Sequence, residues 1–189
     1  MSRAPLAPPE ISVGFPPIAR RDARVLVLGS LPGRMSLEYR QYYAQPRNAF
    51  WRIVEALFGI PFDAPYAKRT HELARRGVAL WDTCAAAHRP GSLDSEIRLD
   101  TVQPNDFAGF YATHRRIARV CFNGAKSAEL YRRLVLPSLP APWRDLPHVA
   151  LPSTSPANAG TDFARKLAAW RSVAEAVQAS DSTARRPGR

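Results

Sequence analysis

Residues 24–33 read RVLVLGSLPG, an uninterrupted apolar run that ends in a loop bracketed by glycines. Short runs of this kind are typical of strands that are buried on both faces of a parallel sheet. Gly29 and Gly33 allow the loop backbone to approach a ligand closely, and Pro32 stiffens the turn. The segment therefore predicts a strand over residues 24–29 and a functional loop directly after it.

Three further apolar runs resemble this strand, and segments with helical spacing lie between them. We expect strands over VALW (78–81), RVCFNG (119–124) and HVAL (148–151), and helices over 48–59, 64–77, 106–114, 125–136 and 161–178. The expected helix N-caps are Asp63, Asn105 and either Thr161 or Asp162. Strands that alternate with helices predict an α/β fold in which helices cover both faces of a parallel sheet.

We expect the strands and helices to form a single domain over residues 23–179. Residues 1–22 are rich in proline and are expected to be irregular, whereas 180–189 are expected to form a basic flexible tail. Residues 82–104 read as a polar loop. Ligands of open parallel sheets bind beyond the carboxyl ends of the strands, so the loops after the four strands are predicted to converge on one site.

The composition favours a cytoplasmic protein with a polyanionic partner. The chain of 189 residues has no apolar run near the ~20 residues of a membrane span, and its N-terminus lacks a signal-peptide pattern. The formal net charge of +11 is typical of proteins that bind nucleic acid, although part of the excess lies in the expected tails. Cys84 and Cys121 form no CxxC pair and the four histidines are scattered, so we expect no disulfide, metal or cofactor.

The loop motifs carry the chemistry. GSLPG (29–33) lacks the spacing of a dinucleotide-binding fingerprint, and NGAKS (123–127) lacks the glycine-lined cradle of a Walker loop. Several stretches taken together resemble the hypoxanthine (deoxyinosine) DNA glycosylases, a branch of the uracil-DNA glycosylase superfamily. They are GSLPGRMSLEYRQYYAQPRNAFW (29–51), GVALWD (77–82), RPGSLDSEI (89–97), FNGAKSAELY (122–131) and LPSTSPAN (151–158).

This resemblance implies a three-layer α/β/α sandwich around a four-stranded parallel sheet. It also implies an enzyme that flips deoxyinosine out of DNA, hydrolyses its N-glycosidic bond and leaves an abasic site, without a cofactor. We expect a monomer without lyase activity. A uracil or mismatch-specific DNA glycosylase, and a catalytically silent DNA-binding module, stay open as alternatives.

Base excision requires groups that clamp phosphates, stack on the base, read its edge and stabilise the sugar cation. Tyr43 matches an aromatic that covers the flipped base in related glycosylases, and Asp82 follows a strand where relatives read the base edge. Asn48 matches the catalytic asparagine of the hypoxanthine branch, and Asp82 is also a possible general base. The residues expected to bind DNA phosphates are Gly29, Ser30, Gly33, Ser153, Thr154, Ser155 and Asn158.

Purely structural roles stay open for several of these residues. Asn48 is placed to cap the helix that follows it, and Asp82 is placed to cap its own loop or to pair with Arg89. We expect three other aromatic residues to pack in the core, namely Tyr42, Phe50 and Trp51.

The chain also departs from the pattern of its relatives. Leu31 stands where related enzymes carry their principal aspartate or asparagine, and leucine does not polarise water. Ser153 replaces a catalytic histidine, and Ala157 falls near the position of the bulky wedge that fills the gap in the duplex. The two lost catalytic groups are the reason that a silent DNA-binding module stays open.

Overall fold

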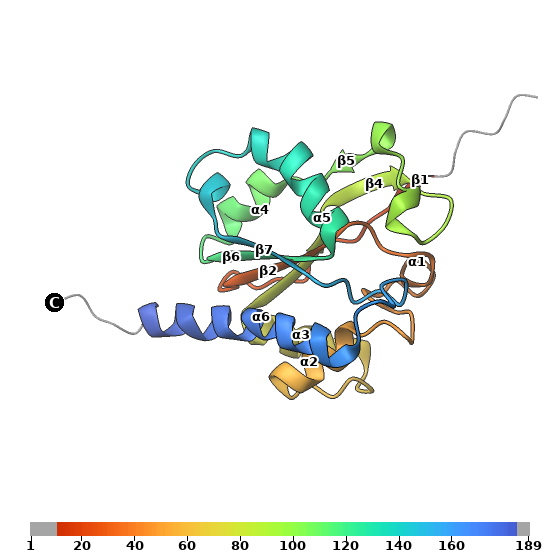
Figure 1. The fold of residues 1–189 in the computed structure, drawn as a ribbon. Helices are drawn as coiled ribbons and strands as arrows, with labels where there is room; N and C mark the ends of the chain where they lie inside the picture. The colour runs from red at the N-terminus through yellow and green to blue at the C-terminus, as the bar shows by residue number, and fades with distance from the viewer. Residues whose placement is uncertain (1–10, 185–189) are drawn as a thin grey trace, which may run out of the picture.

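The computed structural model describes residues 11–184, so the expectations for 1–10 and 185–189 lie outside the described residues. Its centre is a four-stranded, entirely parallel sheet with the strand order β3-β2-β6-β7 (Figure 1). The strands are β2 (Val25–Gly29), β3 (Val78–Asp82), β6 (Arg119–Asn123) and β7 (His148–Leu151). The predicted four-stranded parallel sheet is therefore confirmed.

Helices cover both faces of this sheet, which gives the predicted three layers (Figure 1). Side chains alternate across a strand, so Leu26 and Leu28 of β2 pack in one core cluster and Val25 and Val27 in the other. The first cluster includes residues of α4 (Phe107–Thr113) and α5 (Ala125–Leu130). The second includes residues of α2 (Phe50–Phe58), α3 (Tyr66–Arg75) and α6 (Phe163–Ala184).

A second, antiparallel sheet lies beside the carboxyl ends of the main strands. Its order is β1-β4-β5, with β1 (Ile11–Val13), β4 (Cys84–His88) and β5 (Gln103–Pro104). Residues 1–22 were expected to be irregular and 82–104 to be a polar loop. Both expectations were wrong for the residues that form β1, β4 and β5. The sequence CAAAH has neither alternation nor branched side chains, and its pairing with β1 joins distant parts of the chain.

The shorter elements complete the chain. Helix α1 (Arg34–Tyr39) follows the GSLPG loop and was not expected from the sequence. The remaining turns are 3₁₀ helices η1 (Asp94–Glu96), η2 (Leu99–Thr101), η4 (Leu136–Ser138) and η5 (Trp143–Asp145), and the π-helical turn η3 (Tyr131–Val135).

Helix ends differ in detail from the expected ones. Pro65 takes the N-cap position of α3 expected for Asp63, and Asp106 caps α4 in place of Asn105 by accepting a hydrogen bond from Gly109 N. Of the two expected caps of α6, Asp162 serves, since its Oδ1 accepts from Arg165 N at 2.8 Å. Helix α6 also continues to Ala184, into the segment that was expected to be a flexible tail.

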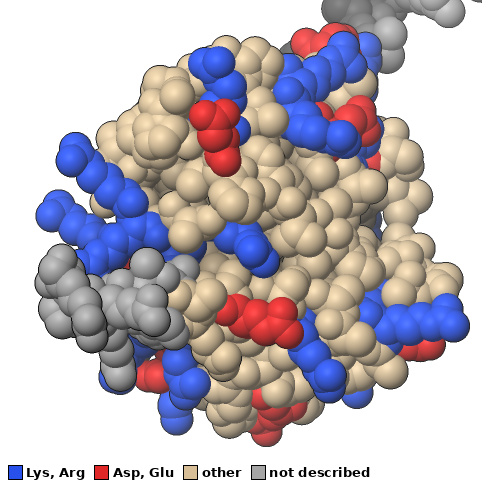
Figure 2. Space-filling model, turned by 60° about the vertical axis from the view of Figure 1, so that its left-hand side comes forward, with Lys and Arg blue, Asp and Glu red and all other residues tan. Residues whose placement is uncertain are grey.

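Basic side chains are spread over the surface shown in Figure 2, which brings forward the side of Figure 1 where α6 ends. Lysine and arginine side chains occupy several separate places on this face, and acidic side chains lie between them (Figure 2). The net charge of +11 is therefore not gathered into one stripe on this side. Within residues 11–184, no helix has the length and apolar character needed to cross a bilayer.

Candidate active site

A cavity of about 1110 Å³ lies at the carboxyl ends of the central strands. Its walls come from residues within 29–36, 42–48, 89–94, 123–125 and 150–158, together with Asp82. Every predicted site residue lines it, namely Gly29, Ser30, Gly33, Tyr43, Asn48, Asp82, Ser153, Thr154, Ser155 and Asn158. The structure thus brings residues from four strand ends around one space.

The Asp82 carboxyl group is buried at the end of β3, next to Gly29 of β2. Its side chain is 3% exposed, and Oδ2 has no hydrogen-bond partner among the described residues. The expected alternative of pairing with Arg89 is not found, because Arg89 forms its ion pair with Asp94. Burial raises the pKa of Asp82 to about 7, while the charge of Arg89 limits the rise. The carboxyl group therefore changes protonation near neutral pH.

This buried carboxyl group predicts a pH-dependent stability. Since the pKa of Asp82 is about 7 in the folded protein and 3.8 for an unperturbed aspartate, its ionisation destabilises the fold progressively as pH rises from about 4 to 7. Asp82→Asn removes that cost. We expect its stability relative to wild type to rise by about 3 kcal/mol between pH 5 and pH 8, or roughly 6–12 °C in melting temperature. Thermal melts at both pH values measure this difference.

The matched control is Asp100→Asn, which removes an exposed carboxylate paired with Arg98. Its melting-temperature difference from wild type is expected to be small at both pH values. A difference for Asp82→Asn that does not change with pH would contradict the raised pKa.

Tyr43 has an unusual backbone and an unpartnered hydroxyl group. Its φ of 57° is in the left-handed region, which is uncommon for residues other than glycine. Its ring stacks on Phe50 with centroids 4.1 Å apart, and its buried Oη has no hydrogen-bond partner among the described residues. Burial raises the pKa of this hydroxyl group. A strained backbone and an unsatisfied buried donor are features that cluster at functional sites.

Neighbouring aromatic residues are structural, as expected. Tyr42, Phe50 and Trp51 are 3%, 1% and 5% exposed. The Trp51 indole nitrogen donates to Tyr42 O at 3.0 Å, and Tyr66 Oη accepts from Tyr42 N at 2.9 Å. These two hydrogen bonds fix the backbone of Tyr42, directly before Tyr43.

Asn48 lines the cavity and lies two residues before the first residue of helix α2, so the N-cap position expected for it is taken by Ala49. Its Oδ1 accepts a hydrogen bond from Phe50 N, the first helical N–H, at 3.0 Å, so it still supports the start of the helix. Its Nδ2 forms no hydrogen bond with residues 11–184. The hydrogen bond from Phe50 N holds the amide in place, while its nitrogen and a second lone pair on its oxygen stay available to a ligand. Support of the helix start and contact with a ligand are thus compatible at this position.

The loop after β7 is fastened by side chains from two other elements. Asn123 makes two hydrogen bonds of 2.8 Å with Thr154, one to its hydroxyl group and one from its backbone nitrogen. Thr154 O accepts from Ala49 N at 3.0 Å. Thr154 is only 1% exposed, and these three hydrogen bonds hold the loop in place. Lys166 Nζ donates to Asn158 O at 3.0 Å and fixes the far end.

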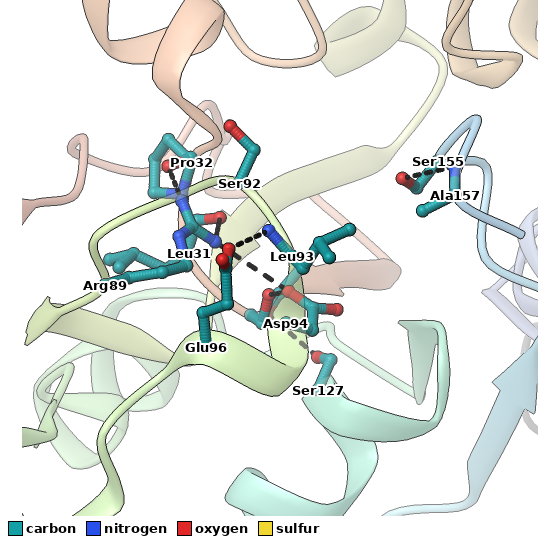
Figure 3. A network of polar contacts seen from close by, with 12 residues as sticks. Leu31, Pro32, Arg89, Ser92, Leu93, Asp94, Glu96, Ser127, Ser155 and Ala157 are labelled. Atoms are coloured by element: carbon teal, nitrogen blue, oxygen red, sulfur yellow. Dashed lines mark hydrogen bonds and ion pairs between the residues drawn. The ribbon is translucent and has the colours of Figure 1, made fainter.

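Within this loop, hydroxyl groups stabilise the turn itself. Ser153 Oγ accepts from Ser155 N at 3.2 Å. Ser155 Oγ accepts from Ala157 N, also at 3.2 Å (Figure 3). Asn158 Nδ2 donates to Ser153 O at 3.1 Å. As acceptors of backbone hydrogen bonds, both serine hydroxyl groups keep their own protons free for an anion.

On the opposite side of the cavity, Arg89 holds the GSLPG loop (Figure 3). Its side chain is 1% exposed, and its guanidinium group donates to the carbonyl oxygens of Leu31 and Pro32. It lies 3.8 Å from Asp94, whose Oδ1 accepts from Ser30 Oγ at 2.5 Å. The side chain of Leu31 packs in an apolar cluster with Cys84, Ala87, Ile97 and Leu130.

The sequence alone assigned no role in the site to Asp94 or Asn123, and it gave Arg89 only as a possible partner of Asp82. The signal for Asn123 was present, because it is a polar residue directly after an apolar strand. Asp94 had no such signal, since its partner Ser30 lies 64 positions away in the chain. The charged stretch RPGSLDSEI has the composition of a loop, and its packing against GSLPG depends on β4.

The fold and the ring of loops at the strand ends define the class of this protein. The chain belongs to the uracil DNA glycosylase superfamily, whose family model matches residues 16–174.

The chain is also similar to particular members of this superfamily. It is 36% identical over 137 residues to a hypoxanthine DNA glycosylase of Methanosarcina acetivorans, which covers 68% of this chain and 85% of the relative. It is 36% identical over 117 residues to the hypoxanthine DNA glycosylase of Methanosarcina barkeri, covering 61% and 73%. A solution NMR structure from Methanosarcina acetivorans, assigned provisionally as a uracil DNA glycosylase, superposes with a TM-score of 0.74 at 33% identity, covering 89% and 99%.

Proposed function

We propose that this protein is a DNA glycosylase that releases hypoxanthine from DNA containing deoxyinosine. The reaction hydrolyses the N-glycosidic bond and leaves an abasic site. The observation that carries the proposal is the identity of 36% to two hypoxanthine DNA glycosylases, over most of a chain whose loops form one ring around the cavity. A cavity of about 1110 Å³ supports it, because a base excised from a duplex must first enter a pocket.

The Asp82 carboxyl group is proposed to read the base. Hypoxanthine presents an N–H donor beside a carbonyl acceptor. A neutral carboxylic acid matches that edge, since its C=O accepts from the N–H and its O–H donates to the carbonyl. With a pKa of about 7 and an unpartnered Oδ2, Asp82 is able to present the neutral form at physiological pH. The ionised form, which is also populated near pH 7, accepts from the N–H of hypoxanthine and repels the N1 acceptor of adenine.

Asn48 is proposed as the principal catalytic residue. Departure of the base leaves positive charge on the sugar, and the dipole of an amide stabilises that charge when its oxygen faces the ring. The hydrogen bond from Phe50 N holds the side chain in place before substrate binds. We further propose that the enzyme has no lyase activity, because no lysine of the described chain lines the cavity to form a Schiff base.

The remaining residues are proposed to hold the DNA strand. Ser153, Ser155 and Asn158 offer hydroxyl and amide donors to phosphates, and Gly29 and Gly33 allow the backbone a close approach. Thr154 supports these residues from within the loop.

The proposal is tested by excision from oligonucleotides that carry one inosine, xanthine or uracil, followed by alkaline cleavage of the abasic product. We expect inosine strands to be cut fastest. Robust uracil cleavage with intact inosine strands would make the protein a uracil glycosylase. Tight DNA binding with no cleavage of any deaminated base would make it a silent DNA-binding module.

Substitutions at Tyr43 test its proposed stacking on the flipped base. Tyr43→Ala is expected to weaken binding to inosine-containing DNA by about 5- to 150-fold, since a base–aromatic stack is worth roughly 1–3 kcal/mol. Tyr43→Phe keeps the ring and removes a hydroxyl group that has no partner among the described residues, so its affinity should stay near wild type. Fluorescence anisotropy measures both dissociation constants.

The control is Tyr39→Ala, at a residue of α1 that is 57% exposed and lies outside the cavity wall. Unchanged affinity is expected for it. Equal affinity for Tyr43→Ala and wild type would contradict the stacking role.

A further inference from the structure

We propose that Ser30 and Asp94 form a proton-accepting pair that holds the attacking water and takes up its proton. The inference rests on the proposed glycosylase activity and adds a catalytic group that the position of Leu31 no longer provides. One short contact carries it, the hydrogen bond of 2.5 Å from Ser30 Oγ to Asp94 Oδ1.

This hydrogen bond decides what Ser30 is able to bind. A hydroxyl group has one proton, and here the proton points to the carboxylate. The Ser30 oxygen therefore presents only lone pairs to other ligands. A DNA phosphate also presents only lone pairs, so the expected role of Ser30 in phosphate binding does not fit this arrangement. A water molecule, which donates, fits it.

Both members of the pair face the same space as the proposed base and sugar sites. Ser30 directly follows β2, is 6% exposed, and lines the cavity. Asp94 lines it from the opposite loop with a side chain that is 39% exposed. The carboxylate is thus reached by water, whereas Asp82 is 3% exposed and adjoins Gly29. The two carboxyl groups have different surroundings and suit different tasks.

Asp94 is held in place by a network of contacts from its own loop and its neighbours (Figure 3). Glu96 Oε2 accepts from Leu93 N at 2.9 Å and closes the η1 turn. Ser92 Oγ accepts from Arg34 N at 3.2 Å and joins this turn to α1. The buried Arg89 guanidinium binds the GSLPG carbonyl groups and lies 3.8 Å from Asp94. A reactive pair needs this kind of fixed geometry.

The proposed pair also accounts for the apolar residue Leu31 in the GSLPG loop. Leu31 packs against Cys84, Ile97 and Leu130, so its side chain anchors the loop in the core. The adjacent residue Ser30 then carries the polar function, with its carboxylate supplied from another loop.

Protons and electrons balance in the proposed step. The water oxygen bonds to the sugar C1′ while the C1′–N9 bond breaks and its electron pair leaves with hypoxanthine. One water proton passes to Ser30 Oγ as the Ser30 proton passes to Asp94 Oδ1. Asp94 then releases this proton to solvent, and the hypoxanthine anion takes one from solvent. The products are hypoxanthine and an abasic site.

The test compares single-turnover excision of an inosine oligonucleotide by wild type, Asp94→Asn, Ser30→Ala and the double variant. Asparagine keeps an acceptor for Ser30 but is not a base. Each single change is expected to lower the rate constant about 10²-fold, the lower range for general-base catalysis. The double variant should be no slower than the slower single variant, because the two residues act as a unit. Dissociation constants for abasic-site DNA should stay within about threefold of wild type.

The control is Asp100→Asn, an exposed carboxylate of η2, which should excise at the wild-type rate. Thermal melts show that each variant is folded. An Asp94→Asn rate within about threefold of wild type, multiplicative losses in the double variant, or losses confined to binding would each overturn the proposal. Failure of the wild type itself to release hypoxanthine would instead overturn the proposed function.

Discussion

Asn48→Ala is expected to lower the single-turnover excision rate by about 10²–10³-fold, the usual effect of removing one preorganised electrostatic group from a reaction centre. The substitution removes both the amide that faces the cavity and the acceptor for Phe50 N. Loss of the hydrogen bond to Phe50 N should destabilise the fold by only about 1 kcal/mol. Excision kinetics and thermal melts, measured on the same preparation, separate the two effects.

Asn48→Ser is the matched control for this hydrogen bond. A serine hydroxyl group also accepts from the backbone N–H two residues further on, so this variant should regain part of the lost stability while its excision rate stays low. A rate for Asn48→Ser near that of wild type would show that Asn48 contributes only its hydrogen bond to Phe50 N. The outcome therefore decides between the structural and the catalytic role.

Gly29→Ala is expected to disrupt the site most severely. A methyl group on Gly29 would overlap Asp82 Oδ1 and lie 3.3 Å from Tyr43 Oη. Both the proposed base reader and the proposed stacking residue would have to move. Overpacking of this kind costs about 1–3 kcal/mol of stability, and a displacement near 1 Å at a reaction centre costs about 10²-fold in rate. Thermal melts and single-turnover excision measure the two losses.

Two further variants identify the cause. Gly160→Ala has open space around the added methyl group and should match wild type in stability and rate. Adding Asp82→Ala to Gly29→Ala removes the overlapping oxygen, so stability should recover while excision stays impaired. If the double variant were as unstable as Gly29→Ala, the clash with Asp82 would not be the reason for the loss.

The central sheet was predictable because its information is local. Each of its four strands is a short apolar run, and each run ends at a polar or glycine residue or at a proline that begins a loop. Gly59 and Gly77 also ended their helices as expected, with φ values of 68° and 82°. Such patterns need no knowledge of the rest of the fold.

The second sheet, and the contacts of Arg89 and Asp94 with the GSLPG loop, were not predictable from local patterns. Strand β4 consists of small residues whose pairing with β1 appears only when distant segments meet. The Ser30–Asp94 bond joins residues 64 positions apart, and no local pattern encodes it. The sequence indicated which residue types gather at the strand ends, but hydrogen bonds between loops decide what each of them faces.

The loops of this enzyme are fastened to one another as well as to the sheet. Arg89 ties two of them on one side, and Asn123 and Ala49 both bind Thr154 on the other. Because these hydrogen bonds hold the site in one shape before DNA binds, the bending and unpairing needed for base flipping must occur in the DNA. A deaminated base in an unstable base pair should therefore be excised at a higher rate than the same base in a stable pair.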